Sequence, residues 1–273
     1  MYTYDMNLFL KIGQYRTRLF LLFLLFLLIG YFGKGSYKSI TDIRPEVLVE
    51  PVQTQVTPKT PIEFQKDGFS YTLTPLFDYR ISGLVVHRMD YNKWYSLSRT
   101  DKTFTTDLCM VWGDNIKSGA YKNKSLSIKQ DFRFCLFSYW GGTPIKNEQL
   151  SNNHLIIRNS DVKKISDGIS AGDQIRITGK LVNVHTDVIG TAGTYEPKVA
   201  DWTTSITRAD ASGGACEIIY VENIEILKKG NVIYHTVYNI GKYGIMMVFF
   251  WYFLEMFRFV FLKNSSGYTF PTN

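Results

Sequence analysis

The sequence predicts a mainly β domain that lies between two transmembrane helices, and three observations carry this prediction. The first is a pair of apolar, aromatic-rich stretches near the two ends of the 273-residue chain, at residues 19–33 and 243–262. The second is the mixed polar and apolar composition of the long part between them. The third is the pattern within that part, where runs rich in aromatic and β-branched residues alternate with turn residues, as is typical of β-strands.

The first apolar stretch, residues 19–33, lies between Arg18 and Lys34 and contains no charged residue. As a helix it would cover only about 22 Å of a hydrocarbon core that is about 30 Å thick. The flanking cationic side chains can extend to the head groups and close this gap. We expect a membrane anchor that follows an N-terminal tail at residues 1–18. The alternative is a cleaved signal peptide, because basic residues precede the stretch and small residues follow it.

The second stretch, residues 243–262, is long enough to cross a bilayer but contains Glu255 and Arg258. These two residues are three positions apart, so they share a helical face and can pair. We expect the pair at the level of the head groups, close to the aromatic residues that favour this zone. A helix that lies in the plane of the membrane is the alternative. Residues 230–242 would then form a juxtamembrane linker and residues 263–273 a C-terminal tail.

The formal net charge of +7 is concentrated beside the apolar stretches. Residues 35–235 contain 24 basic and 22 acidic side chains, which leaves a surplus of only +2. Cationic residues beside a membrane segment suit anionic lipid head groups, whereas a diffuse surplus of this size is a poor match for nucleic acid. We therefore expect the lipid bilayer as a partner and do not expect nucleic acid. More basic residues precede the first stretch than follow it, which places the middle domain outside the cytosol.

Residues 34–68 contain four prolines, at positions 45, 51, 58 and 61. This composition favours extended, polyproline-like backbone, so we expect a linker that holds the domain away from the bilayer. The alternative is an arm that lies along the domain as an edge strand.

The β domain is expected to span residues 69–229. Its candidate strands are residues 71–76, 79–87, 108–112, 132–139, 174–184 and 217–227, with one helix at residues 161–170. In residues 174–184 apolar side chains alternate and Gly179 permits a bend or bulge, and a later strand returns with its own alternation. This pattern resembles the closing strands of OB-fold barrels, with Gly83 inside the bent first strand. We therefore expect an OB-like small barrel, a fold that binds many kinds of ligand and leaves the function open.

Five segments are similar to a family of uncharacterised bacterial membrane-anchored proteins: FDYRISGLVVHR, DLCMVWGDN, LSNNHLI, GDQIRITGKLV and TSITRADASGGACEIIYVENIEIL. The resemblance covers residues 76–227 and is most specific in the last segment. It implies that these segments form one unit of a bacterial cell envelope, and it implies no activity. Together with the distribution of basic residues, it predicts a location at the bacterial inner membrane with the domain outside the cytosol.

The segment TSITRADASGGACE contains candidate binding residues, namely Arg208, Asp210 and Glu217. A guanidinium group can hold a carboxylate or phosphate through two hydrogen bonds, and consecutive glycines allow close approach to a ligand. Asn152 and Asn153 are further candidates because their amides can bond to a ligand. The alternatives are a plain hairpin connection in which Arg208 pairs with Asp210, and a turn at the Asn-Asn-His run.

The three cysteines allow two hypotheses. Cys216 is a candidate nucleophile with His154 as its general base, the thiolate attacking an acyl carbon, although nothing in the sequence brings the two together. A cysteine that packs at the start of a buried strand is the alternative. Cys109 and Cys135 lie in two candidate strands, and they can form a disulfide if these strands are neighbours in an oxidising compartment.

We expect neither a metal nor a cofactor, because the four histidines have no ligand spacing and no Cys-x-x-Cys pattern occurs. A nuclease of the staphylococcal type would add Asp173 and Arg176 to the charged residues named above, but no segment reproduces the arrangement of that family. The leading hypothesis is a non-enzymatic protein that binds another envelope protein or a glycan. The alternative is a cysteine-dependent envelope enzyme that acts on an acyl or peptide bond.

Overall fold

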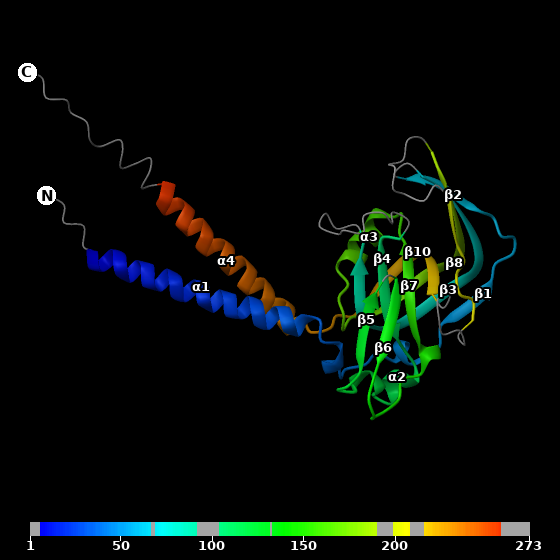
Figure 1. The fold of residues 1–273 in the computed structure, drawn as a ribbon, viewed down its shortest axis with the longest axis horizontal. Coiled ribbons are helices and arrows are strands. Elements are labelled where there is room, and N and C mark those ends of the chain that lie inside the picture. Colours follow the sequence, from blue (N-terminus) through cyan, green and yellow to red (C-terminus); the bar gives the residue numbers. More distant parts are fainter. Residues whose placement is uncertain are drawn as a thin grey trace, which may run out of the picture. The chain divides into compact units, whose positions relative to one another are not determined.

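The computed structural model describes residues 6–66, 69–91, 104–131, 133–189, 199–207 and 216–257. The chain divides into a helical unit, Met1–Lys34 with Val232–Asn273, and a β unit, Gly35–Asn231. The described structure is mainly β with two apolar terminal helices (Figure 1).

The helical unit consists of α1 (Met6–Lys34) and α4 (Val232–Phe257), and both helices are long and apolar enough to cross a membrane. They contact each other, for example through the rings of Phe20 and Phe249, whose centroids are 6.0 Å apart. Figure 1 draws α1 in blue and α4 in orange. Because α4 begins at Val232, most of the segment expected as a juxtamembrane linker, residues 230–242, is helical.

Glycines allow the two helices to approach closely. A Cβ atom added at Gly241 would lie 2.4 Å from the backbone nitrogen of Leu27, and one at Gly30 would lie 2.4 Å from that of Tyr238. Small residues at such contacts are typical of helix pairs in membranes, where backbone packing replaces the hydrophobic effect.

An ion pair joins the same two helices close to the C-terminal end of α4. Arg16 of α1 pairs with Glu255 of α4, and the indole Nε1 of Trp251 donates to the same carboxylate at 3.0 Å. The guanidinium also lies 4.6 Å from the ring centroid of Tyr252. Glu255 thus has its partner on the other helix, whereas Arg258, the partner expected from the sequence, lies outside the described residues.

The described part of the β unit contains ten strands, two short α-helices and four 3₁₀ turns. The strands are β1 (Val52–Gln55), β2 (Ile62–Lys66), β3 (Phe69–Asp90), β4 (Thr106–Val111), β5 (Ser127–Asp131), β6 (Phe134–Ser138), β7 (Leu150–Ile156), β8 (Gln174–Val188), β9 (Val199–Trp202) and β10 (Cys216–Lys228). The helices are α2 (Asp114–Lys117) and α3 (Ser160–Asp167), and the 3₁₀ turns are η1 (Tyr37–Ser39), η2 (Pro45–Leu48), η3 (Ala120–Lys122) and η4 (Asn147–Gln149).

The main sheet has the strand order β1-β3-β4-β7-β10-β8-β9, with β2 also paired to β3 and a further pairing between β3 and β8. The pairing of β7 with β10 is parallel, whereas the other pairings are antiparallel. β5 and β6 form a separate two-stranded sheet. Alternate side chains of β4 enter different apolar clusters, Leu108 and Met110 on one face and Cys109 and Val111 on the other.

Two glycines expected at bends occupy crowded positions in this sheet. A Cβ at Gly179 of β8 would lie 2.1 Å from the carbonyl oxygen of Tyr220, next to a register shift in β10. A Cβ at Gly83 of β3 would lie 3.0 Å from the carbonyl oxygen of Val111. The candidate strands at residues 71–76 and 79–87 are one long strand, because a register shift between Pro75 and Phe77 carries β3 through the break.

Within the segment 34–68, the described residues 34–66 do not form the extended linker expected from their prolines. β1 and β2 pair with β3, and Val47 of η2 is fully buried. The carboxylate of Glu50 accepts hydrogen bonds from the indole of Trp112 at 3.1 Å and the amide of Gln149 at 2.7 Å. Apolar burial and these polar contacts fix the segment as an arm of the β unit, which is the edge-strand alternative.

The two points where the chain enters and leaves the β unit are tied together. The side-chain amide of Asn231 donates to the carbonyl oxygen of Ser36 at 3.1 Å, and the hydroxyl of Ser39 donates to the Asn231 side chain at 2.9 Å. The residues next to both apolar helices are therefore neighbours within the β unit.

Candidate functional site

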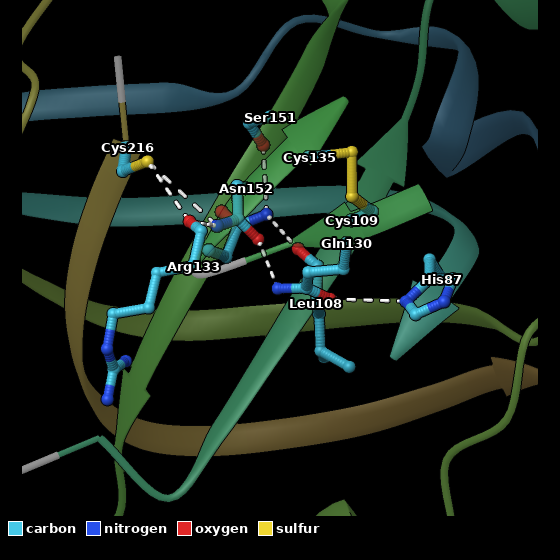
Figure 2. The surroundings of a disulfide bond; sticks show 10 residues. His87, Leu108, Cys109, Gln130, Arg133, Cys135, Ser151, Asn152 and Cys216 are labelled. Atoms are coloured by element: carbon cyan, nitrogen blue, oxygen red, sulfur yellow. Dashed lines mark hydrogen bonds between the residues drawn. A yellow bond between two sulfur atoms is a disulfide. The ribbon is translucent and has the colours of Figure 1, made fainter. Parts of the chain in front are cut away.

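The candidate residues lie on three neighbouring strands, β4, β7 and β10. Asp107 of β4 is opposite His154 of β7, and Asn152 lies between Cys109 of β4 and Cys216 of β10. Because side chains alternate along a strand, these five residues share one face of the sheet. Figure 2 shows this face around the disulfide.

A fully buried carboxylate, that of Asp107, is the centre of a polar cluster on this face. Its Oδ1 lies 2.8 Å from Nδ1 of His154, and its Oδ2 accepts a hydrogen bond of 2.8 Å from the hydroxyl of Tyr91. Among the described residues, neither Oδ1 of Asp107 nor Nδ1 of His154 makes an aligned hydrogen bond. The Asp107 carboxylate and the ring of Phe104, whose centroid lies 5.2 Å from that of the imidazole, surround His154 on this face.

Arg133 extends across the cluster from the tip of the β5–β6 hairpin. Its guanidinium carbon lies 4.3 Å from the ring centroid of Tyr91 and 4.5 Å from that of Phe104, and its NH1 lies 3.5 Å from Oδ1 of Asp107. The residue has a φ of 70°, a left-handed conformation that strains a residue with a side chain by about 1 kcal/mol. The cation between two rings offsets this strain and fastens the hairpin tip to the sheet.

The disulfide and a series of hydrogen bonds through two side-chain amides hold the rest of the hairpin. Cys109 and Cys135 are joined, with their Cα atoms 5.9 Å apart. Asn152 donates to the carbonyl oxygen of Arg133 and accepts from the amide of Gln130 at 2.9 Å, and Gln130 in turn contacts His87 at 3.2 Å (Figure 2). Asn152, expected as a ligand-binding residue, therefore binds the hairpin.

The sulfur of Cys216 also contacts the hairpin tip. Its Sγ lies 3.8 Å from the carbonyl oxygen of Arg133, to which the thiol donates, and 3.9 Å from the amide nitrogen of Asn152 (Figure 2). His154 lies on the neighbouring strand of the same face and contacts Asp107 and the ring of Phe104. The structure thus brings the two residues of the nucleophile hypothesis onto one face and gives each a different set of contacts.

The other residues predicted to bind a ligand do not lie in the cluster around Asp107 and Cys216. Asn153 and Glu217 are opposite each other on the other face of β7 and β10, where both are buried. The amide of Asn153 donates to the carbonyl oxygen of Leu108 at 3.1 Å. Arg208 and Asp210 lie outside the described residues. The Asn-Asn-His run forms strand β7, so the turn considered for it is wrong.

The residues considered for a nuclease have structural partners. Asp173 accepts hydrogen bonds from the backbone N–H groups of Ser170 and Gly230, and Arg176 pairs with Glu225 at 2.7 Å. Within the described ranges, no group of three or more His, Cys, Asp or Glu side chains could hold a metal ion.

Sequence reasoning missed four members of the cluster, Tyr91, Phe104, Asp107 and Arg133. An acidic residue beside the apolar run LCMVW was a usable signal for Asp107, because a buried carboxylate requires partners. The other three become neighbours only through the placement of the hairpin and the ends of β3 and β4.

Comparisons with protein-family models, with curated proteins and with solved structures find no match to this chain. The resemblance to a bacterial membrane-anchored family therefore stays a prediction.

Proposed function

We propose that the chain is a membrane-anchored binding protein whose β unit is an OB-like barrel. The strand pairing supports this proposal and is the observation that carries it. β3, β4, β7, β10 and β8 pair in succession, and β8 pairs with β3 again. The parallel contact of β7 with β10 and the helix α3 between β7 and β8 fit the order of five-stranded OB barrels, which are binding modules.

We place the β unit outside the cytosol at a bacterial inner membrane. The two apolar helices support anchoring, and the bond between Cys109 and Cys135 supports an oxidising compartment. The basic residues that precede the first apolar stretch, residues 19–33, agree with this orientation.

The contacts made by the residues of the polar cluster support a binding function rather than catalysis. Asp107 is fully buried, His154 is buried, and Arg133 is stacked between two rings. The sulfur of Cys216 contacts the carbonyl oxygen of Arg133 and the amide of Asn152, so its described contacts are with the hairpin tip and its partner strand. These groups fasten the hairpin to the barrel face.

The proposed partner is another envelope protein, with a glycan as the alternative ligand. OB barrels bind through their loops and the face of the second and third strands. These strands correspond here to β4 and β7, which are buried and carry the β5–β6 hairpin, so we assign the partner to the loops. Exposed Ile206 lies in the connection between β9 and β10 and suits a contact test, because the hydroxyl of Thr204 in the same segment accepts a hydrogen bond from the backbone N–H of Ile218 in β10.

The test uses the full chain in cells, with a photo-crosslinking amino acid in place of Ile206. The matched control carries the same amino acid at Ile165, an exposed apolar residue on α3. We expect a discrete adduct from position 206 alone, and mass spectrometry then distinguishes a peptide from a glycan. Identical adducts from both positions, or none from position 206, would contradict the binding proposal.

A cysteine-dependent enzyme is the second candidate, favoured by the placement of Cys216 and His154 on neighbouring strands with Asp107 beside the imidazole. A thiol-directed probe separates the candidates in the full chain in nanodiscs. The binding proposal expects slow labelling of Cys216 that is the same in His154→Gln. Fast labelling that His154→Gln suppresses would establish the enzyme instead.

A further inference from the structure

The β5–β6 hairpin presents apolar side chains to solvent. Phe134 and Leu136 of β6 are 42% and 53% exposed, while Cys135 and Phe137, which alternate with them, pack inward. The chain that follows adds two aromatic residues, Tyr139 and Trp140, which are 36% and 87% exposed. We call Phe134, Leu136, Tyr139 and Trp140 the hairpin surface.

Hydrogen bonds fix the backbone that carries Trp140. The hydroxyl of Ser125 donates to the carbonyl oxygen of Trp140 at 2.7 Å and accepts from its backbone N–H at 2.9 Å. The amide of Asn123 donates to the carbonyl oxygen of Gly141 at 2.7 Å. The indole is therefore held out on an ordered backbone, which reduces the entropy lost when it binds a surface.

The chain that leaves the first apolar helix binds the same region. Nζ of Lys38 donates to the carbonyl oxygen of Lys124 at 3.2 Å and to that of Leu126, the two residues that flank Ser125. Lys38 follows Lys34, the last residue of α1, by four positions, a path of at most about 14 Å when fully extended. The covalent path from α1 to this region is therefore short.

Two lysines lie beside the hairpin surface. Lys129 of β5 is exposed and lies directly opposite Leu136 of β6. Lys124 is also exposed, in the turn that holds Trp140. The combination of tryptophan, tyrosine and lysine is the one that favours the water interface of a bilayer with anionic lipids.

We propose that the hairpin surface docks into the head-group region of the bilayer that holds the apolar helices. Trp140 and Tyr139 place their rings at the interface, Phe134 and Leu136 add apolar contact, and Lys124 and Lys129 bind anionic head groups. This docking rests on the anchoring proposed above, and it uses a surface other than the one assigned to the partner.

The test is fluorescence quenching of the full chain in nanodiscs with lipids brominated close to the head group. The chain has five tryptophans, so the emission of Trp140 is obtained as the difference between the unmodified protein and Trp140→Phe. We expect this difference emission to be quenched, and more strongly with anionic than with neutral lipids. Lys129→Glu should lower the quenching in anionic nanodiscs, because it reverses a charge beside Leu136.

Trp202→Phe is the matched control, because Trp202 packs against Phe104 within the β unit and its difference emission should not respond to the brominated lipids. Unquenched Trp140 emission in nanodiscs that contain the protein would overturn the docking proposal. Quenching that appears only when two copies share a nanodisc would also contradict it, because the hairpin surface would then require a second copy of the chain. A failure of anchoring is distinguishable, since the chain would then not enter nanodiscs at all.

Discussion

The carboxylate of Asp173 accepts the backbone N–H of Gly230 at 2.8 Å and thereby joins the start of β8 to the end of β10. The second oxygen of this fully buried carboxylate accepts the N–H of Ser170 at 2.8 Å and pairs with Lys229. A Cβ at Gly230 would lie only 2.3 Å from the carbonyl oxygen of Gly172, so glycine is required for this close approach.

Asp173→Ala should lower the free energy of unfolding by about 2 to 3 kcal/mol, because it leaves buried N–H groups without an acceptor. Asp161→Ala on α3 is the matched control, since its carboxylate is exposed and its pair with Lys164 contributes little. Urea titration of the full chain in micelles, followed by tryptophan fluorescence, measures both changes. Equal effects of the two substitutions would contradict the role of Asp173.

Removal of the disulfide by Cys135→Ser should lower the free energy of unfolding by about 3 kcal/mol. The bond closes a loop between residues 26 positions apart, and opening it increases the entropy of the unfolded chain. Reduction of the unmodified protein should give the same loss, whereas Cys216→Ser should leave the sensitivity to reduction unchanged. A free energy of unfolding that is the same with and without the reductant would be evidence against this bond.

Asp107 and His154 should show energetic coupling in a double-mutant cycle. We expect a coupling of about 1 to 3 kcal/mol in the free energy of unfolding for Asp107→Asn with His154→Gln, because both groups are buried and 2.8 Å apart. The control is the cycle of His185 with Asp201, an exposed pair at 2.6 Å, whose coupling should be much smaller. Additive effects at Asp107 and His154 would show that the two groups do not interact.

Gly241→Leu should separate α1 from α4, because its side chain would occupy the space of the Leu27 backbone. Spin labels at Leu28 and Ile240 report the distance between the helices in nanodiscs, in a protein that also carries Cys216→Ser. We expect a longer and broader distance distribution than in the unsubstituted pair. Met247→Leu, at an exposed position of α4, should leave the distribution unchanged.

The hydrogen bond to Asp201, with the further charge of Asp187, raises the pKa of His185 above its ordinary value. A raised pKa in the folded state means that the protonated form stabilises the fold. This contribution is complete below the pKa of the unfolded chain, and it is lost as the pH rises through the raised pKa. NMR titration should show a lower pKa for His185 in Asp201→Asn, and an unchanged value would contradict the assignment.

The local pattern of the sequence was sufficient to predict several strands and one helix of the β unit. Residues 174–184 and 217–227 were predicted as strands and lie within β8 and β10, because aromatic and β-branched residues alternate there. The crowding around Gly179 agrees with the bulge expected beside it. The helix expected at residues 161–170 corresponds to α3, which Asn159 caps through its side chain.

Contacts between residues far apart in the chain determined the elements that the local sequence pattern could not predict. The Asn-Asn-His run of β7 has the composition of a turn, and it becomes a strand because Asn152, Asn153 and His154 find buried partners from distant segments. The prolines of residues 34–68 fit an extended linker as well as edge strands, and the contacts of Val47 and Glu50 favour the second. The position of Arg133 depends on a hairpin tip folding back over β4 and β7.

The tie between Ser36 and Asn231 sets a limit on processing of the polypeptide. A peptidase that cuts just after residue 33 would release the amino-terminal helix while leaving both halves of this tie in place, and the β unit would stay tethered through α4. A cut after residue 40 would remove Tyr37 and Ile40, which pack in an apolar cluster with Val47. The loss of these contacts would destabilise the β unit. Maturation and folding are thus compatible only within a window of a few peptide bonds.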